Sequence, residues 1–199
     1  LAGQHDITGA IRLEEQALAL MRARLGPQHP DVAMVHNSLG LALAKGGRHA
    51  EALATYQAGL AAAVDLPQQR NHIYMTLWFN TGAVLQDLKR DAEAEAPIRE
   101  AIAVLERSSE RLLTDTFFLR ISLGTLLTKL KRDAEAEAVL LADLAEAEQV
   151  WGPDHPLIMD VLIPLSGLRL AAGDAPQAAA LAERAHALCL RATPGPPRD

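Results

Sequence analysis

The sequence predicts an all-α protein that forms a right-handed solenoid of helix-turn-helix repeats. Residues 88–96 read LKRDAEAEA, and the same nine residues recur at 130–138, a displacement of 42 positions. Within one period the apolar residues recur every three or four positions, which is the spacing of a helix rather than of a strand. The 199-residue chain is also 49% hydrophobic but only 4% aromatic. A repeat of this length with this spacing is typical of stacked helix pairs.

The 42-residue register continues along the whole chain. One column of equivalent positions contains Gly40, Gly82, Gly124 and Ser166. A second column contains Ala10, Ala52, Ala94, Ala136 and Ala178. The segment LGPQHP at 25–30 returns three periods later as WGPDHP at 151–156. Small residues in these columns would let the two helices of one unit approach closely.

Each period should contain two amphipathic helices joined by a tight turn. Leu39 and Leu43 share one stripe of the first helix with Gly40, and Ala52 and Tyr56 share one stripe of the second with Gly59. Nine helices are expected, over residues 5–24, 31–45, 48–64, 70–87, 91–107, 111–129, 133–150, 157–172 and 175–191.

Turn-forming residues justify the ends of these helices. Gly46-Gly47 should end the helix at 31–45, and Pro30 and Pro156 suit the first position of the helices that follow them. Asp91, Asp133 and Asp174 are placed to accept the free N–H groups of the next first turn.

Two prolines fit the expected helices less easily. Pro97 and Pro164 lie well inside them, where each removes one hydrogen bond, so we expect local kinks. The array should form a single domain over 1–192, with a half repeat at 3–25 and full repeats at 26–67, 68–109, 110–151 and 152–191. The tail at 193–199, with three prolines, is expected to be disordered.

The repeats resemble the tetratricopeptide repeat. Its pattern places a bulky residue, Leu-Gly and a second bulky residue on the first helix, then Ala, an aromatic or aliphatic residue and Ala on the second. The positions that match best are Trp78, Gly82, Leu85, Ala94, Ile98 and Ala101, and Leu39, Gly40, Leu43, Ala52 and Tyr56. The 42-residue period and the segment LGPQHPDV resemble the longer variety found in kinesin light chains and in many bacterial signalling proteins.

The last repeat departs from the family pattern. Ser166 stands in place of the small glycine, Arg169 in place of a bulky apolar residue, and Ala182 where Tyr56 stands in the first repeat. This unit should therefore pack less tightly or act as an end cap.

Composition excludes several classes of function. The 19 basic and 25 acidic side chains give a net charge of -6, so we expect neither nucleic-acid nor membrane-surface binding. The single cysteine, Cys189, rules out an intrachain disulfide or a cysteine zinc cluster. No apolar run is long enough for a membrane helix, and no signal peptide is visible at the first residues. We expect a soluble, cytoplasmic protein.

The chain carries no recognisable catalytic or cofactor motif. It lacks a phosphate-cradling glycine loop, a nucleophile elbow and a His-Glu-x-x-His pair, so we expect a non-enzyme with no cofactor and no metal. His29 and His155 are interpreted as residues that cap or pack the turns between repeats, and Trp78 and Trp151 as packed residues. The acidic residues at helix starts, namely Glu93, Glu95, Glu135 and Glu137, should interact with the helix dipole.

The family resemblance implies that the first helix of each repeat lines a concave groove. The side opposite the core stripe then carries Met34, Asn37, Leu41 and Lys45, and at steps of 42 also Thr76, Phe79, Ala83, Asp87, Phe118, Ile121, Thr125, Lys129, Asp160, Ile163, Gly167 and Ala171. Asn80 and Gln86 flank these positions. Asn80 sits where such repeats often hold an asparagine that bonds a ligand's backbone.

The groove residues predict the type of ligand. Met34, Phe79, Phe118, Ile121 and Ile163 form an apolar strip, and the regular Lys and Arg set that clamps a terminal carboxylate is absent. A peptide or protein segment with apolar anchors, extended or helical, is the expected partner. The alternative is that Phe79 and Phe118 pack against their own neighbours or a second copy.

Two functions remain open at this point. The first is a non-catalytic protein–protein interaction scaffold. The second is the regulatory or sensor region of a larger bacterial signalling protein, such as a Ser/Thr kinase or a transcriptional activator.

The first helix should expose apolar residues. It fits the second helix of a repeat whose first helix is missing, and the chain opens with Leu1, so we expect a piece of a longer array. Ile7, Ile11 and Leu18 should be partly uncovered, which predicts weak self-association through this half repeat.

Overall fold

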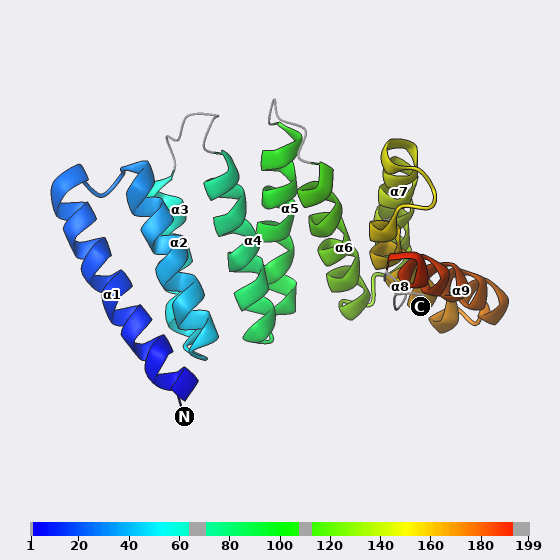
Figure 1. Ribbon diagram of the computed structural model, residues 1–199, viewed down its shortest axis with the longest axis horizontal. Helices are drawn as coiled ribbons and strands as arrows, with labels where there is room; N and C mark the ends of the chain where they lie inside the picture. Colours follow the sequence, from blue (N-terminus) through cyan, green and yellow to red (C-terminus); the bar gives the residue numbers. More distant parts are fainter. Residues whose placement is uncertain (1, 64–70, 108–112, 193–199) are drawn as a thin grey trace, which may run out of the picture. The chain divides into compact units, whose positions relative to one another are not determined.

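A computed structural model describes residues 2–63, 71–107 and 113–192, and the regular structure in these ranges is helical throughout (Figure 1). The helices in chain order are α1 (Ala2–Leu25), α2 (Pro30–Lys45), α3 (His49–Ala62), α4 (Asn71–Asp87), α5 (Asp91–Glu106), α6 (Leu113–Lys129), α7 (Asp133–Trp151), the short 3-10 helix η2 (Pro156–Ile158), α8 (Met159–Ala171) and α9 (Ala175–Ala192). The predicted all-α repeat fold is therefore confirmed. The predicted tail at 193–199 and the predicted helix ends at 64, 70 and 111 lie outside the described residues.

The chain forms two compact units, Leu1–Thr116 and Phe117–Asp199. The first contains α1 to α5, and the second contains most of α6 and all later helices. We call the first helix of each repeat, namely α2, α4, α6 or α8, its inner helix and the second its outer helix. In the first unit α2 packs on α3 and α4 packs on α5. In addition, α1 contacts α2, and α3 contacts α4. In the second unit α8 packs on α9 and on α7. Each unit is thus a stack of helix pairs.

The glycine column marks the closest approach of paired helices. A Cβ atom built on Gly82 would lie 2.6 Å from Cγ1 of Ile98, and one built on Gly124 would lie 2.6 Å from Cγ of Leu140. A Cβ atom built on Gly40 would overlap the ring of Tyr56 in the same way. The predicted role of these small residues is confirmed.

The core stripes predicted from the first full repeat are also confirmed. The residues that were placed on them are all buried, namely Leu39, Gly40, Leu43, Ala52, Tyr56 and Gly59. In the last repeat, the hydroxyl of Ser166 donates a 2.8 Å hydrogen bond to the carbonyl of Ala178 on α9. A serine is therefore accommodated where the other repeats have glycine, because its polar atom finds a partner across the helix pair.

The prediction that all three aspartates cap helices is only partly correct. The Asp174 carboxylate accepts the N–H of Gln177 at 3.1 Å, as expected. Asp91 and Asp133, however, are already the first residues of α5 and α7, and the cap positions belong to Arg90 and Arg132. In all three turns the cap follows a left-handed residue, namely Lys89 or Lys131 at φ 62° or Gly173 at φ 83°. Asp174 stands directly after that residue, whereas Asp91 and Asp133 stand one position later.

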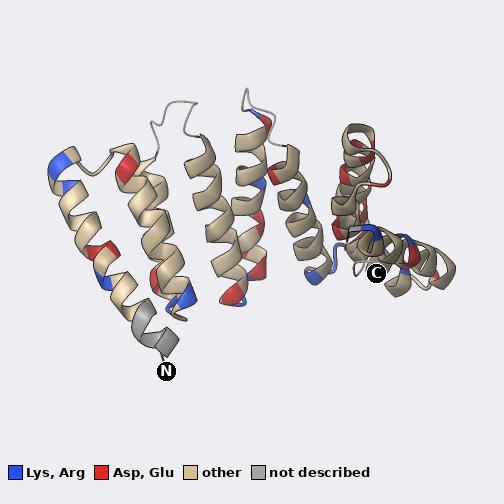
Figure 2. Cartoon of the chain, viewed as in Figure 1, with Lys and Arg blue, Asp and Glu red and all other residues tan. Residues whose placement is uncertain are grey.

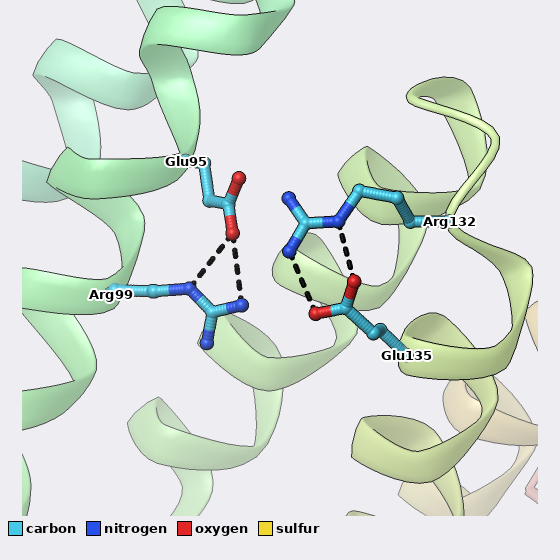
Figure 3. Close-up of polar contacts among 4 residues, drawn as sticks. All are labelled: Glu95, Arg99, Arg132 and Glu135. Carbon is cyan, nitrogen blue, oxygen red and sulfur yellow. Dashed lines mark hydrogen bonds and ion pairs between the residues drawn. The ribbon is translucent and has the colours of Figure 1, made fainter.

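At these two helix starts the arginine makes no side-chain cap hydrogen bond and pairs instead with a glutamate of the first turn. Arg132 donates two hydrogen bonds of 2.6 and 2.7 Å to Glu135, and Figure 3 draws this fork together with the Glu95–Arg99 pair inside α5. Arg90 and Glu93 form the same fork at 2.7 Å for both bonds. The arginine lowers the pKa of Glu93 by hydrogen bonding, so the carboxylate stays charged in the first turn.

The internal prolines do not end their helices. Pro97 is buried inside α5 and Pro164 lies inside α8, and both helices continue past them. The helix expected at 157–172 begins as the 3-10 turn η2 and becomes α-helical at Met159.

The exposure predicted for α1 is right for two residues and wrong for one. Ile7 and Leu18 are half-buried, but Ile11 is only 5% exposed. Ile11 is equivalent to Leu53 of α3, which is also buried, so it faces the following inner helix rather than the uncovered side. The strongly exposed residues of α1 are instead Leu13 and Leu20, at 62% and 53%.

The glycine column leads to a stability prediction. Gly124→Ala should destabilise the protein by about 1–3 kcal/mol, because the new methyl group would overlap Leu140 in a packed core. Gly167→Ala in α8 is the matched control, since a Cβ there meets nothing within 4 Å. It should be neutral or stabilise by up to about 1 kcal/mol, as expected for Gly→Ala inside a helix. Urea denaturation of both variants measures the difference, and equal stabilities would contradict the packing account.

Candidate binding surface

The inner helices of the first unit, α2 and α4, carry the first group of predicted groove residues. Met34 and Leu41 on α2 are 48% and 42% exposed, and Phe79 and Ala83 on α4 are half-buried. The two helices are in contact with each other. The structure therefore brings the α2 and α4 residues onto neighbouring helices, with large apolar side chains open to solvent.

Two asparagines join these helices. The Asn80 side-chain amide on α4 donates a 2.8 Å hydrogen bond to the Asn37 amide oxygen on α2. This bond uses one donor of Asn80 and one acceptor site of Asn37, and an asparagine amide offers two donors and one acceptor oxygen. Asn37 is about one helical turn from Met34 and from Leu41 on α2. Asn80 follows Phe79 on α4. The remaining polar atoms of the two amides would fix the register of a chain bound there.

Charged residues stand only at the ends of these two helices. In α2 they are Asp31 in the first turn and Lys45 at the last position, and in α4 the one charged residue is Asp87 at the end. Figure 2 shows the central part of α4 without charge. Thr76, half-buried on α4, directs its hydroxyl to the His72 carbonyl at 2.7 Å. The middle of the surface is apolar and amide-bearing.

The second unit carries its own exposed apolar residues on α6 and α8. Phe118 is 43% exposed and Ile163 is 60% exposed, whereas Ile121 is half-buried. Thr125, like Thr76, bonds to its own helix, at the Ile121 carbonyl. The other predicted positions here are the exposed Lys129, Gly167 and Ala171 and the half-buried Asp160, whose burial raises its pKa.

An aromatic cluster supports Phe118. Its ring meets the ring of Phe117 edge to face, with 5.5 Å between centroids, and Phe117 is 3% exposed. Phe117 in turn meets Trp151 at 5.1 Å, and Trp151 lies 5.1 Å from His155. The predicted packing of Trp151 is confirmed, and Phe118 is the exposed member of an otherwise covered group.

The histidines before proline act as predicted. Nδ1 of His29 accepts the N–H of Asp31 at 3.2 Å at the start of α2, and Nδ1 of His155 accepts the N–H of Leu157 at 3.3 Å. Trp78 is half-buried rather than fully in the core, and its ring meets Tyr74 edge to face at 6.0 Å. These residues stabilise turns and helices.

Sequence reasoning missed a buried charged group in the second unit. Asp143 on α7 is 2% exposed, and its Oδ1 lies 3.4 Å from Nη1 of Arg120 on α6. The same Nη1 atom lies 2.5 Å from Glu146. The other Asp143 oxygen is buried and has no hydrogen-bond partner among the described residues. Burial raises the Asp143 pKa to about 7, against the opposing effect of Arg120.

The 42-residue register contained a signal for this group. Asp143 shares its column with Gly59, Ala101 and Ala185, all of which are small and buried. A carboxylate in a column of small residues is unusual, and it indicates a buried polar group that needs a partner.

Neither a metal cluster nor a membrane span is found in the part of the chain that the structure describes. No group of three or more His, Cys, Asp or Glu side chains in these ranges could hold a metal ion. Among the same residues, no helix combines the length and the apolar character that crossing a bilayer requires.

Comparison with known proteins agrees with this architecture. Two family models, both of the tetratricopeptide repeat, match residues 1–63 and 120–157. No curated protein matches the sequence. Among solved structures, the nearly identical TPR-like repeats of a kinesin light chain from Podosopora anserina have a TM-score of 0.81 at 19% identity, covering 94% of this chain and 90% of that one.

Two further structures are similar. BtubC (BKLC) from P. vanneervenii has a TM-score of 0.79 at 18% identity, covering 98% of this chain and 76% of the other. YrrB, described as a TPR protein with an unusual peptide-binding site, has a TM-score of 0.62 at 18% identity, covering 96% of this chain and 86% of the other. At these identities the likeness establishes the fold.

The buried carboxylate leads to a prediction about pH. Because the folded-state pKa of Asp143 is about 7 and lies above its ordinary value, the folded protein binds this proton more tightly than the unfolded chain does. The contribution of Asp143 to the free energy of unfolding is therefore largest at acidic pH, and it is lost as the pH rises toward 7. Asp143→Asn should raise the melting temperature at pH 8 by at least about 2–4 °C, the shift for 1 kcal/mol.

The advantage of Asp143→Asn should shrink as the pH is lowered to 5, because the native carboxyl is then protonated. Glu137→Gln is the control: it removes a carboxylate on the same helix that pairs with Arg169 and is not among the groups that shift the Asp143 pKa, so its pH dependence should follow that of the native protein. Calorimetry from pH 5 to 8 makes the comparison, and a constant difference across this range would contradict the assignment.

Proposed function

Because the chain belongs to the tetratricopeptide repeat family, we propose that it is a non-catalytic scaffold whose inner helices bind a peptide or protein segment. The observation that carries the proposal is the exposure of large apolar side chains on these helices. Met34, Leu41, Phe118 and Ile163 are 42–60% exposed. Met34 and Leu41 lie together on α2, which contacts α4, and neighbouring exposed apolar side chains mark an interaction surface.

The chemistry of the surface selects the kind of ligand. Its central part is uncharged in the first unit, and Lys45 stands alone at the end of α2. Apolar anchors of the ligand would contact Met34, Leu41 and Phe79, while the Asn37–Asn80 pair would bond to its backbone. YrrB, whose fold is similar, is described as having a peptide-binding site, which supports a peptide as the ligand class. An apolar peptide therefore fits this surface better than an acidic tail does.

We propose in addition that the chain associates weakly with itself through the N-terminal half repeat. The support is α1, where Leu13 and Leu20 are 62% and 53% exposed. Covering one leucine side chain fully is worth about 1.5–3 kcal/mol, so two leucines provide a modest driving force for association.

The groove proposal predicts a separation of binding from stability. Peptides should be selected from a random display library on the native protein, and their affinities should be measured by fluorescence anisotropy. Met34→Asp in the first unit or Phe118→Asp in the second should weaken binding by about tenfold or more, the effect of removing an anchor residue. The melting temperature should change less than it does for a core residue, because Met34 and Phe118 are 48% and 43% exposed.

Leu141→Asp provides the matched control. Leu141 is 44% exposed, close to Phe118, but it lies on the outer helix α7. This variant should bind the selected peptides as the native protein does. Two results would contradict binding at the inner helices. One is an equal loss of peptide affinity in Leu141→Asp and Phe118→Asp, and the other is a peptide affinity that neither Met34→Asp nor Phe118→Asp changes.

A further inference from the structure

The first unit shows how one repeat packs on the next. The outer helix α3 contacts the following inner helix α4. Leu53 on α3 and Leu85 on α4 are 7% and 5% exposed. A Cβ atom built on Gly59 would lie 2.8 Å from Cδ2 of Leu77 on α4 and 2.9 Å from Cβ of His36 on α2. Position 59 therefore lies between two inner helices, in a junction that is apolar and closely packed.

Charged residues occupy the equivalent junction of the second unit. Two periods after the two leucines stand Glu137 on α7 and Arg169 on α8, and their side chains form an ion pair. A second pair joins α7 to α9, where Oε1 of Glu148 lies 2.5 Å from Nη2 of Arg184. We call these contacts of α7 with α8 and α9 the ionic junction. The four side chains are 29–35% exposed, so water and salt weaken both pairs.

Asp143 on α7 stands at the position equivalent to Gly59. Its Oδ1 atom lies 3.4 Å from Nη1 of Arg120 on α6. The residue equivalent to Leu77 is Val161 on α8, which is 0% exposed and has no polar atom in its side chain. The repeat register thus places the Asp143 carboxylate between Arg120 and an apolar part of α8. Its Oδ2 atom is buried without a hydrogen-bond partner among the described residues.

The charged groups near Asp143 come from three helices. From α6 there is Arg120, and from α7 itself there is Glu146, which contacts the same Nη1 atom. The charged residues of α8 are Asp160 and Arg169, and neither is among the groups that shift the pKa of Asp143. Burial is the largest cause of that shift, and it raises the pKa to about 7. The ionised carboxylate is therefore only partly compensated while α8 lies against α7.

We propose that the ionic junction is a pH-sensitive switch, at which α8 and α9 separate together from α7 when Asp143 ionises. Separation lets water reach the carboxylate oxygen that has no partner while the junction is closed. The two helices move as a pair because they pack on each other, and the Ser166 hydroxyl on α8 bonds to the Ala178 carbonyl on α9. Protonation of Asp143 removes the buried charge and keeps the junction closed.

Proton binding gives the direction and the size of the effect. The pKa of Asp143 is about 7 in the closed junction and returns toward its ordinary value of 3.8 when water reaches the group, so the closed junction binds the proton more tightly. The closed form is therefore favoured at acidic pH. The equilibrium constant for separation rises with pH and levels off above pH 7, which gives an increase of about tenfold between pH 6 and pH 8.

Separation also alters the candidate binding surface of the second unit. Ile163 lies on α8 and moves with it, whereas Phe118 lies on α6 and stays behind. This consequence rests on the proposed function, but the separation itself does not.

Thiol labelling tests the switch without a ligand. Val161→Cys in a Cys189→Ser background places a thiol that is covered while the junction is closed. Its rate of reaction with dithiodipyridine is divided by the rate for the urea-unfolded chain at the same pH, which removes the effect of thiol ionisation. This normalised rate should rise about tenfold from pH 6 to pH 8. Adding Asp143→Asn should abolish the rise.

Leu77→Cys is the matched control. Leu77 is the equivalent of Val161 at the apolar junction of the first unit, and it is also 0% exposed. Its normalised rate should not show the tenfold rise. An unchanged rate for Val161→Cys at the two pH values, or a rise that persists with Asp143→Asn, would overturn the proposal. An equal rise for Leu77→Cys would overturn it as well, because the chain would then unfold as a whole.

Hydrogen exchange measured by mass spectrometry makes the same test on the native chain. After correction for the intrinsic exchange rate, the protection of α8 and α9 should fall from pH 6 to pH 8, because a separated helix pair does not bury its apolar face. Protection of α6 and α7 should change much less. An equal loss in all four helices would overturn a switch at the ionic junction. Neither measurement uses a peptide, so peptide binding by the inner helices is tested separately.

Discussion

The close contact between paired helices at the glycine column determines where every other surface of the repeats lies. Gly40, Gly82 and Gly124 on inner helices each receive a large side chain from the outer helix, namely Tyr56, Ile98 and Leu140. Any side chain on these glycines would have to displace a buried residue, so this face of the inner helix is committed to packing. The opposite face is left for solvent or for a ligand.

The second unit replaces several apolar contacts of this scheme with charged ones. Glu137 on α7 pairs with Arg169 on α8, whereas the equivalent positions in the first unit are the buried Leu53 and Leu85. Arg184 on α9 reaches both Glu148 and the Pro153 carbonyl, and Arg120 reaches Asp143 and Glu146. A contact between helices that is made by arginine–carboxylate pairs gains less from burial than an apolar contact does, and its strength depends on the ionisation of the carboxylates. The arginine that departs from the family pattern at position 169 is thus part of the packing between repeats.

Much of the fold could be predicted from the sequence because strong local signals set the helix ends. Proline and glycine place α2 to within one residue, and the repeated aspartates place the starts of α5 and α7. Two of the details that escaped prediction have different physical reasons. Asn37 and Asn80 are 43 residues apart, one position out of register, so the repeat gave no reason to pair them. The arginine caps escaped because they depend on a left-handed backbone at Lys89 and Lys131.

The placement of the aromatic residues argues that the exposed face of the inner helices is more than leftover surface. The chain has three phenylalanines, Phe79, Phe117 and Phe118. Phe79 and Phe118 stand at positions predicted to line the groove, and Phe117 is the buried ring that contacts Phe118. Packing of the repeat does not require an aromatic residue at position 118, since the core stripe of α6 is already filled by Leu123, Leu126 and Leu127. A ring that is held by a buried neighbour loses little conformational freedom on binding, and this is the property that makes aromatic residues effective anchors in an interface.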